Sequence, residues 1–163
     1  MHWQDNGIDG GIMIHTIHIS VDTVIDKAVM QSASDFRALR ITDPQAANVV
    51  YEDFVFLPDN RREAEAILAR ASVSINSLLK AHILEMTLSP NVIIFAMQIE
   101  KCSDAGQMGL FMTDYMVYSL LGWWYAARNT ALSESCNLRA ADSAAEVLHM
   151  LTPKFSERRV RLF

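Results

Sequence analysis

Hydrophobic and polar residues follow a two-residue period near the start of the chain and a helical period over most of the remainder. Residues 12–21, IMIHTIHISV, are rich in β-branched side chains, which predicts a short strand. A helix is predicted over residues 23–40, where Thr23 and Asp26 are spaced as a capping pair. It is expected to end before Pro44, because proline disfavours the helical conformation in the residue ahead of it.

A second and longer helix is predicted after the sequence PDN at 58–60, with an apolar stretch at 49–57 ahead of it. Asn60 and Glu63 have the spacing of a capping pair. Apolar residues then recur at three- and four-residue steps over about 26 residues, or about 39 Å of helix, so the helix must pack along its whole length. The apolar stripe consists of Ala64, Ile67, Leu68, Ala71, Ile75, Leu78, Leu79, Ile83 and Met86.

A break at Ser89-Pro90-Asn91 ends this pattern. The run VIIFAMQI at 92–99 then predicts a buried strand, with a short helix as the alternative. Such a strand would pair with residues 12–21. Residues 102–109 are expected to form a loop.

The segment 110–128, LFMTDYMVYSLLGWWYAAR, is apolar on nearly all sides. A membrane span is one interpretation, but Asp114 would cost about 2.5–3.5 kcal/mol near the centre of such a span. We therefore expect no membrane insertion. The segment is instead predicted to be a central helix, either buried on most sides or partly covered by another subunit. A last helix is predicted over residues 131–151, and Pro153 ends it.

Together these elements predict a mainly helical protein. The expected fold is a four-helix bundle-like domain at 12–152 with a two-stranded β element formed by 12–21 and 92–99. Residues 1–11 have no apolar period and are expected to be disordered. Residues 153–163 form a basic C-terminal tail.

Composition adds limits on the class of protein. Of 163 residues, 51% are hydrophobic and 20% are charged, as in ordinary globular proteins. The net charge of -5 argues against a general nucleic-acid binder. Charge is uneven, because residues 1–60 hold nine acids and three bases, whereas the tail holds four bases and one acid. Head-to-tail contacts or a charged partner would use this asymmetry.

Few residues suggest chemistry. Two distant cysteines, Cys102 and Cys136, and a start without signal-peptide features indicate a reducing, cytoplasmic location. On a strand, His15 and His18 would point to opposite faces, so they would not share a metal ion. His82, on the stripe of the long helix, and His149 are the candidates for a catalytic base, although core or rim histidines are the simpler interpretation. No catalytic motif, phosphate-binding loop, metal site or cofactor site is predicted.

Two groups of side chains are candidates for contacts. The aromatic cluster either fills the core or forms an oligomer interface, and its adjacent tryptophans lie about 100° apart on a helix, so one is expected near the surface. The basic residues of the tail are candidates for contact with a charged partner, and nucleic acid is considered only through them. A simply disordered terminus is the alternative. The aromatic residues are Tyr115, Tyr118, Trp123, Trp124 and Tyr125, and the basic residues are Lys154, Arg158, Arg159 and Arg161.

The order of features from about Asp59 onward resembles that of small helical structural proteins encoded in prophages of Bacteroidales, of the head-tail connector and tail-completion type. The features are the helix RREAEAILARASVSINSLLKAHI, an apolar spacer, the aromatic helix LFMTDYMVYSLLGWWYAARN, an alanine-rich last helix and the tail KFSERRVRLF. The resemblance covers about two thirds of the chain and does not extend to the N-terminal region. It implies assembly through ring-forming protein contacts, without enzyme residues, and a location in a virion if the protein derives from a phage.

Three functions follow as hypotheses. The first is a non-enzymatic structural or interaction protein that associates with itself or with other assembly proteins. The alternative is a small helical ligand-binding domain with an apolar pocket between the long and aromatic helices, suggested by their apolar surface and by nine methionines. The third is a small hydrolase that uses His82 or His149.

Overall fold

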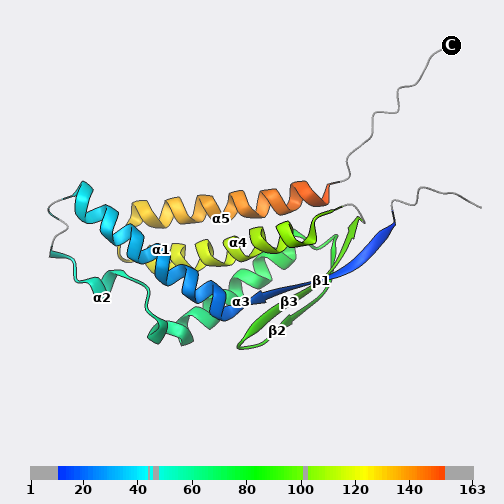
Figure 1. Ribbon diagram of the computed structural model, residues 1–163, viewed down its shortest axis with the longest axis horizontal. Coiled ribbons are helices and arrows are strands. Elements are labelled where there is room, and N and C mark those ends of the chain that lie inside the picture. The colour runs from blue at the N-terminus through cyan, green and yellow to red at the C-terminus, as the bar shows by residue number, and fades with distance from the viewer. Residues whose placement is uncertain (1–10, 44, 46–47, 101–102, 153–163) are drawn as a thin grey trace, which may run out of the picture.

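A computed structural model describes residues 11–43, 45, 48–100 and 103–152 of the chain. The protein is mainly helical, as predicted, with one small sheet (Figure 1). The elements are β1 (Ile12–Ser20), α1 (Val21–Thr42), α2 (Tyr51–Phe54), the 3-10 turn η2 (Pro58–Asn60), α3 (Arg61–Leu78), β2 (Ile83–Leu88), β3 (Val92–Glu100), α4 (Ala105–Tyr125) and α5 (Thr130–Leu151).

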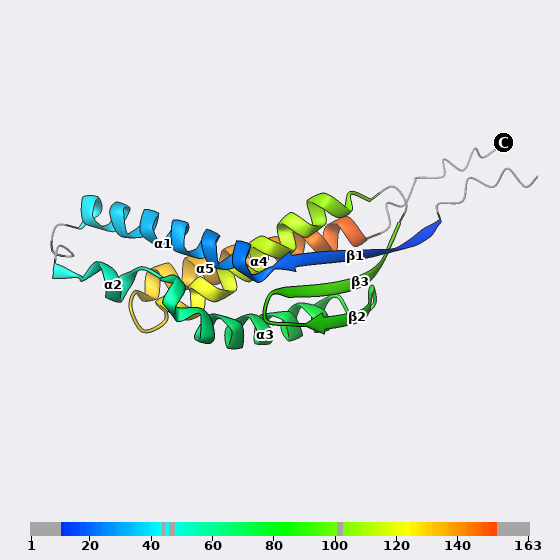
Figure 2. The same ribbon diagram turned by 60° about the horizontal axis from the view of Figure 1, so that its bottom comes forward.

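The sheet has three antiparallel strands in the order β1-β3-β2 (Figure 2). The predicted pairing of the first strand with residues 92–99 is confirmed, and its register runs from Ile12 opposite Glu100 to Ser20 opposite Val92. The prediction of only two strands is wrong, because β2 pairs with the other side of β3. The central strand is therefore β3, and β1 and β2 form the two edges.

The long helix ends about eight residues earlier than the predicted stripe. It stops at Leu78, and Ile83 and Met86 belong to β2. A bulge between Ile83 and Glu85 places Ile83 opposite Met97 and Met86 opposite Phe95, both of which are buried. Because the bulge adds one residue, positions three apart face the same side of the sheet, which imitates helical spacing.

Three helix starts also differ from the predictions. Asn60 is the N-cap residue of α3, but its side-chain oxygen accepts from the Leu57 amide at 3.3 Å and caps no amide of α3, so the predicted Asn60–Glu63 capping pair does not form. The N-cap of α1 is Ser20, whose hydroxyl accepts a hydrogen bond from the Thr23 amide at 3.2 Å, so the proposed Thr23–Asp26 pair is not the cap. The predicted loop at 102–109 is wrong from Ala105 onward. There the carboxylate of Asp104 accepts from the Gln107 amide at 3.0 Å and begins α4, despite two glycines in the first turns.

The aromatic helix α4 is central to the fold. It contacts α1, α3, α5 and β1, and α5 runs back along it after a short turn (Figure 1). Four long helices are present, but a four-helix bundle is not confirmed, because the sheet takes part in the same core. Ile19, Phe95 and Met97 from the sheet are as fully buried as Met112 and Met116 of α4.

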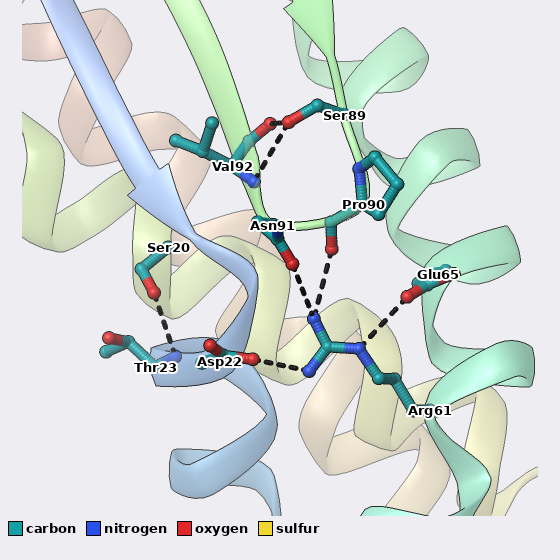
Figure 3. A network of polar contacts seen from close by, with 9 residues as sticks. All are labelled: Ser20, Asp22, Thr23, Arg61, Glu65, Ser89, Pro90, Asn91 and Val92. Carbon is teal, nitrogen blue, oxygen red and sulfur yellow. Dashed lines mark hydrogen bonds and ion pairs between the residues drawn. The ribbon is translucent and has the colours of Figure 1, made fainter.

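One arginine joins three elements at the start of α3. Arg61 donates to the carboxylates of Asp22 in α1 and Glu65 in its own helix, and also to the backbone oxygen of Pro90 at 3.1 Å (Figure 3). It also donates to the side-chain oxygen of Asn91 at 3.4 Å. These hydrogen bonds connect the turn between β2 and β3 to the first turns of α1 and α3.

In the described residues, no helix has both the length and the apolar character that crossing a bilayer requires. Asp114, the charge within the aromatic helix, is nearly half exposed and pairs with Lys27 of α1 at 3.7 Å. The carboxylate therefore stays in contact with solvent.

Candidate protein-interaction surfaces

The predicted aromatic cluster divides between the interior and the surface. Trp124 and Tyr125 are buried, whereas Trp123 is 41% exposed, so the two adjacent tryptophans do face different environments. Tyr115 and Tyr118 are half-buried. Of the five residues, Trp123 offers the most surface to a partner.

Trp124 holds the α2 segment against the core. Its indole Nε1 donates to the backbone oxygen of Phe54 at 2.7 Å, and its ring meets that of Phe56 edge-on at 5.2 Å. The guanidinium of Arg128 lies 3.5 Å from the centre of the indole and donates to the backbone oxygen of Asp53 at 2.7 Å. These contacts give Trp124 a packing role.

A polar cluster lies where α1, α4 and α5 meet. The hydroxyl of Tyr125 donates to Asp35 at 2.8 Å, and the amide of Gln31 donates to the other oxygen of the same carboxylate at 2.9 Å. Burial, and then the charge of Asp35, raise the pKa of Cys136 from 9.0 to about 11. The thiol therefore remains protonated at neutral pH and is a poor nucleophile.

Four of the five histidines lie within the described residues, and the structure places them apart from one another. His15 and His18 lie on opposite faces of β1, as predicted, because they are three residues apart on a strand. His82 lies in the turn before β2 rather than on the long helix, and His149 is exposed near the end of α5. Among the described residues, no group of three or more potential ligands could hold a metal ion.

Of three further predicted features, two lie outside the part of the chain that the structure describes, and the third can be located. Cys102 and the four basic residues of the tail lie outside the described residues. The predicted pocket between the long and aromatic helices falls where α3 and α4 pack closely. Ser72 and Met116 are both fully buried there, with the hydroxyl 3.9 Å from the sulfur.

The outer face of the sheet is the first surface that the described residues leave uncovered. Ile93, Phe95, Met97 and Ile99 point inward and are buried. Val92, Ile94 and Ala96 point to the other side, are partly exposed, and do not belong to the hydrophobic core. Beside them on β1, Ile14 is 65% exposed and lies opposite Gln98. We call these four apolar residues, Ile14, Val92, Ile94 and Ala96, the outer-face patch.

A groove along the free edge of β1 is the second surface. It has a volume of about 390 Å³ and lies between the strand and the first half of α4. Thr16, Ile17 and His18 form its strand side. On the helix side, Gly109 approaches closely, since a Cβ atom at this position would lie 3.6 Å from the Ile17 side chain.

The sequence contains a pattern that indicates the outer-face patch, but it contains no pattern that indicates the groove beside β1. The run VIIFAMQI is apolar at successive positions, which is typical of a strand covered on both faces. The groove depends on how α4 lies against β1, and that arrangement has no local signature. Comparison with protein-family models, with curated proteins and with solved structures gives no match for this chain.

Proposed function

We propose that this protein is a non-enzymatic structural or interaction protein that assembles through the outer face of its sheet. The proposal rests on β3, where the apolar character of the strand does not match its burial. This strand has apolar side chains on both faces, but the described part of the chain buries only the inward set. A second protein surface would bury the other set.

The surroundings of β3 support an interface there. Ile12 and Ile14 are 69% and 65% exposed, so the apolar surface continues onto β1. Antiparallel sheets with one solvated face normally alternate apolar and polar residues, and the centre of this face does not. Contiguous exposed apolar surface of this kind marks interaction sites in proteins.

A copy of the same chain is the proposed partner. The four residues of the outer-face patch carry no charge. The acids on the same face, Glu85 opposite Ala96 and Glu100 opposite Ile12, lie on an edge strand and at a strand end, where two copies can leave them in solvent at the rim of the interface. The resemblance of residues 59–163 to connector-like phage subunits fits a protein whose role is to assemble, in the cytoplasm or in a virion. The functional class proposed is therefore an assembly subunit.

Substitution of one exposed isoleucine tests this proposal. We expect Ile14→Glu to lower the molar mass measured by light scattering, because a carboxylate in the interface would lose its water without gaining a partner. The matched control is Ile41→Glu. Ile41 is 82% exposed and lies in the last turn of α1, so this variant should keep the mass of the unmodified protein.

The two variants distinguish the possible outcomes. Loss of mass in Ile14→Glu alone supports the outer face as the interface. Equal loss in both variants would show that added negative charge, and not the position, controls association. An unmodified protein that remains a single chain at every concentration would reject self-assembly.

A further inference from the structure

β1 is an edge strand that is open to further pairing. One side of it pairs with β3 over all nine residues. On the other side, no backbone hydrogen bond joins it to another segment within the described ranges. Edge strands normally carry charges, prolines or bulges that prevent such pairing, but β1 has no bulge and contains no proline, lysine, arginine or acidic residue. The opposite edge, β2, carries Glu85 and a bulge, so the described residues protect one edge of the sheet and leave the other open.

The register of the sheet identifies which backbone groups of β1 are free. Val21, one residue beyond the strand, donates to the backbone oxygen of Asn91 at 3.0 Å. Hydrogen-bonded pairs alternate with non-hydrogen-bonded pairs in an antiparallel ladder, so every second residue counted back from Val21 bonds to β3. Ile12, Ile14 and Thr16 fall between those residues. Their N–H and C=O groups therefore face the free edge.

Side chains at the start of β1 are exposed on both faces of the sheet. Ile12 and Ile14 are 69% and 65% exposed on the outer face, and Met13, between them, is 42% exposed on the inner face. The start of the strand reaches past the first turn of α4 (Figure 1, Figure 2). The groove beside α4, whose helix wall carries the exposed Leu110, meets β1 from Thr16 onward. The described residues thus leave the first part of the strand without cover on its edge and on both faces.

We propose that the start of β1 pairs with β1 of a second copy as an antiparallel strand, about a twofold axis beside Ile14. Ile14 then lies opposite Ile14 of the partner subunit, and Ile12 lies opposite Thr16 of the partner subunit. These are residues whose backbone groups face the free edge, so each pair exchanges two hydrogen bonds. The inference rests on the proposed role as an assembly subunit and adds an edge interface to the outer-face interface.

A second copy suits this edge because the exposed part of the strand complements itself. Antiparallel pairing places the uncovered start of one strand along the uncovered start of the other, so each strand covers what the other leaves exposed. The paired segment, residues 12–16, contains no lysine, arginine or acidic residue, so like charges do not meet across the pair. The segment ends at Thr16, where the groove begins, so the pairing does not depend on space beside Leu110.

Edge pairing would also enlarge the surface that is proposed for assembly. The twofold axis that relates two antiparallel edge strands is perpendicular to the sheet, so both copies keep their outer faces on the same side. The product is one six-stranded sheet in the order β2-β3-β1-β1-β3-β2, and its outer face carries two outer-face patches. The edge and the outer face can therefore act as two interfaces in one assembly.

Amide hydrogen exchange on the full chain at two protein concentrations tests the edge pairing. The Ile14 and Thr16 amides gain protection when a second strand accepts from them. We expect them to exchange at least about tenfold more slowly when the concentration is raised about a hundredfold. The Ile17 and Ile19 amides, which donate to β3, should stay protected throughout and report that the fold is intact. Equal exchange of the edge amides at both concentrations would overturn the pairing, and a mass that still rises would leave the outer-face interface standing.

A proline substitution removes one edge donor. Thr16→Pro deletes an N–H that faces away from β3, a position at which edge strands tolerate proline. We expect fast exchange of the Ile14 amide at high concentration in this variant, and slow exchange in Thr16→Val, which keeps the N–H. Where Thr16→Pro exposes the Ile17 amide, Ile12→Pro deletes the corresponding donor at the first residue of the strand. Slow exchange of the Ile14 amide in a folded proline variant would overturn the proposal.

Ile94→Glu separates the two interfaces. Ile94 belongs to the outer-face patch and lies on the central strand, away from the free edge. This variant should weaken outer-face contacts and keep the concentration-dependent protection of the Ile14 and Thr16 amides. Loss of that protection in Ile94→Glu would overturn the edge pairing, because outer-face contacts would then account for it. A chain that stays single at every concentration would reject both the edge pairing and the proposed assembly.

Discussion

Tyr125 and Asp35 form a hydrogen bond of 2.8 Å that joins α4 to α1. Tyr125 has no exposed surface, and its hydroxyl and the side-chain amide of Gln31 both donate to the carboxylate. Burial, followed by the charge of Asp35, raises the pKa of Tyr125 far above its ordinary value. The contact therefore holds the central helix in place as long as the phenol keeps its proton.

Removing this hydroxyl should destabilise the fold. We expect Tyr125→Phe to lower the free energy of unfolding by about 1–2 kcal/mol, because Asp35 would lose one donor in a partly buried site. Urea denaturation followed by circular dichroism measures the change. Tyr51→Phe is the matched control, since Tyr51 is 41% exposed, and its variant should unfold as the unmodified protein does. Equal midpoints for the Tyr125→Phe variant and the unmodified protein would show that the bond contributes nothing.

Stability should also fall in alkaline solution. Burial raises the pKa of Cys136 from 9.0 to about 11, so between these values the unfolded chain loses a proton that the folded chain keeps. The free energy of unfolding must then decrease as pH rises from 9 to 11, by at most about 3 kcal/mol from this group. Cys136→Ala should show a smaller decrease over the same range. An identical decrease in both proteins would assign the effect to other groups.

The adjacent tryptophans should respond differently to the same substitution. Trp124→Phe removes the hydrogen bond to Phe54 and weakens the stacking of Arg128, so we expect a loss of about 2–3 kcal/mol in the free energy of unfolding. Trp123→Phe alters a side chain that is 41% exposed and should change it by less than about 0.5 kcal/mol. Thermal or urea unfolding of the two variants makes the comparison. Similar losses would contradict the packing role assigned to Trp124.

Arg61→Gln should loosen the turn between β2 and β3 without unfolding the protein. The substitution removes the charge shared by Asp22 and Glu65, together with the bond to the backbone of Pro90 (Figure 3). We expect faster amide exchange at residues 91–92, measured against Arg62→Gln, which alters an exposed neighbour in the same turn of helix. No difference between the two variants would show that the turn is held by its own hydrogen bonds.

Local pattern was sufficient for the long helices and for one strand pair. The apolar periods of α1, α3 and α5 and the apolar run of α4 identified the four long helices, and runs of β-branched and apolar residues identified β1 and its partner β3. The third strand was missed because the bulge near Leu84 gives Ile83 and Met86 a helical separation. Here the pairing with β3 overrides the local spacing, and that pairing depends on residues distant in the chain.

The surfaces were less predictable than the elements. The apolar run of β3 suggested a strand covered on both sides, but only the fold shows which side stays open. Trp123 and Trp124 were expected to differ in burial from helix geometry alone, whereas the bond from Trp124 to Phe54 joins residues 70 apart in sequence. Contacts at such separations follow from topology and leave no local signal.

Sedimentation equilibrium of the unmodified chain tests the central claim most directly. A single chain has a mass of 18.3 kDa. If the outer-face patch is an interface between copies, the average mass should rise above this value over roughly a hundredfold range of concentration, and Ile14→Glu should return it to that of one chain. A mass of one chain throughout that range would contradict self-assembly, and an unchanged assembly in Ile14→Glu would contradict the surface proposed for it.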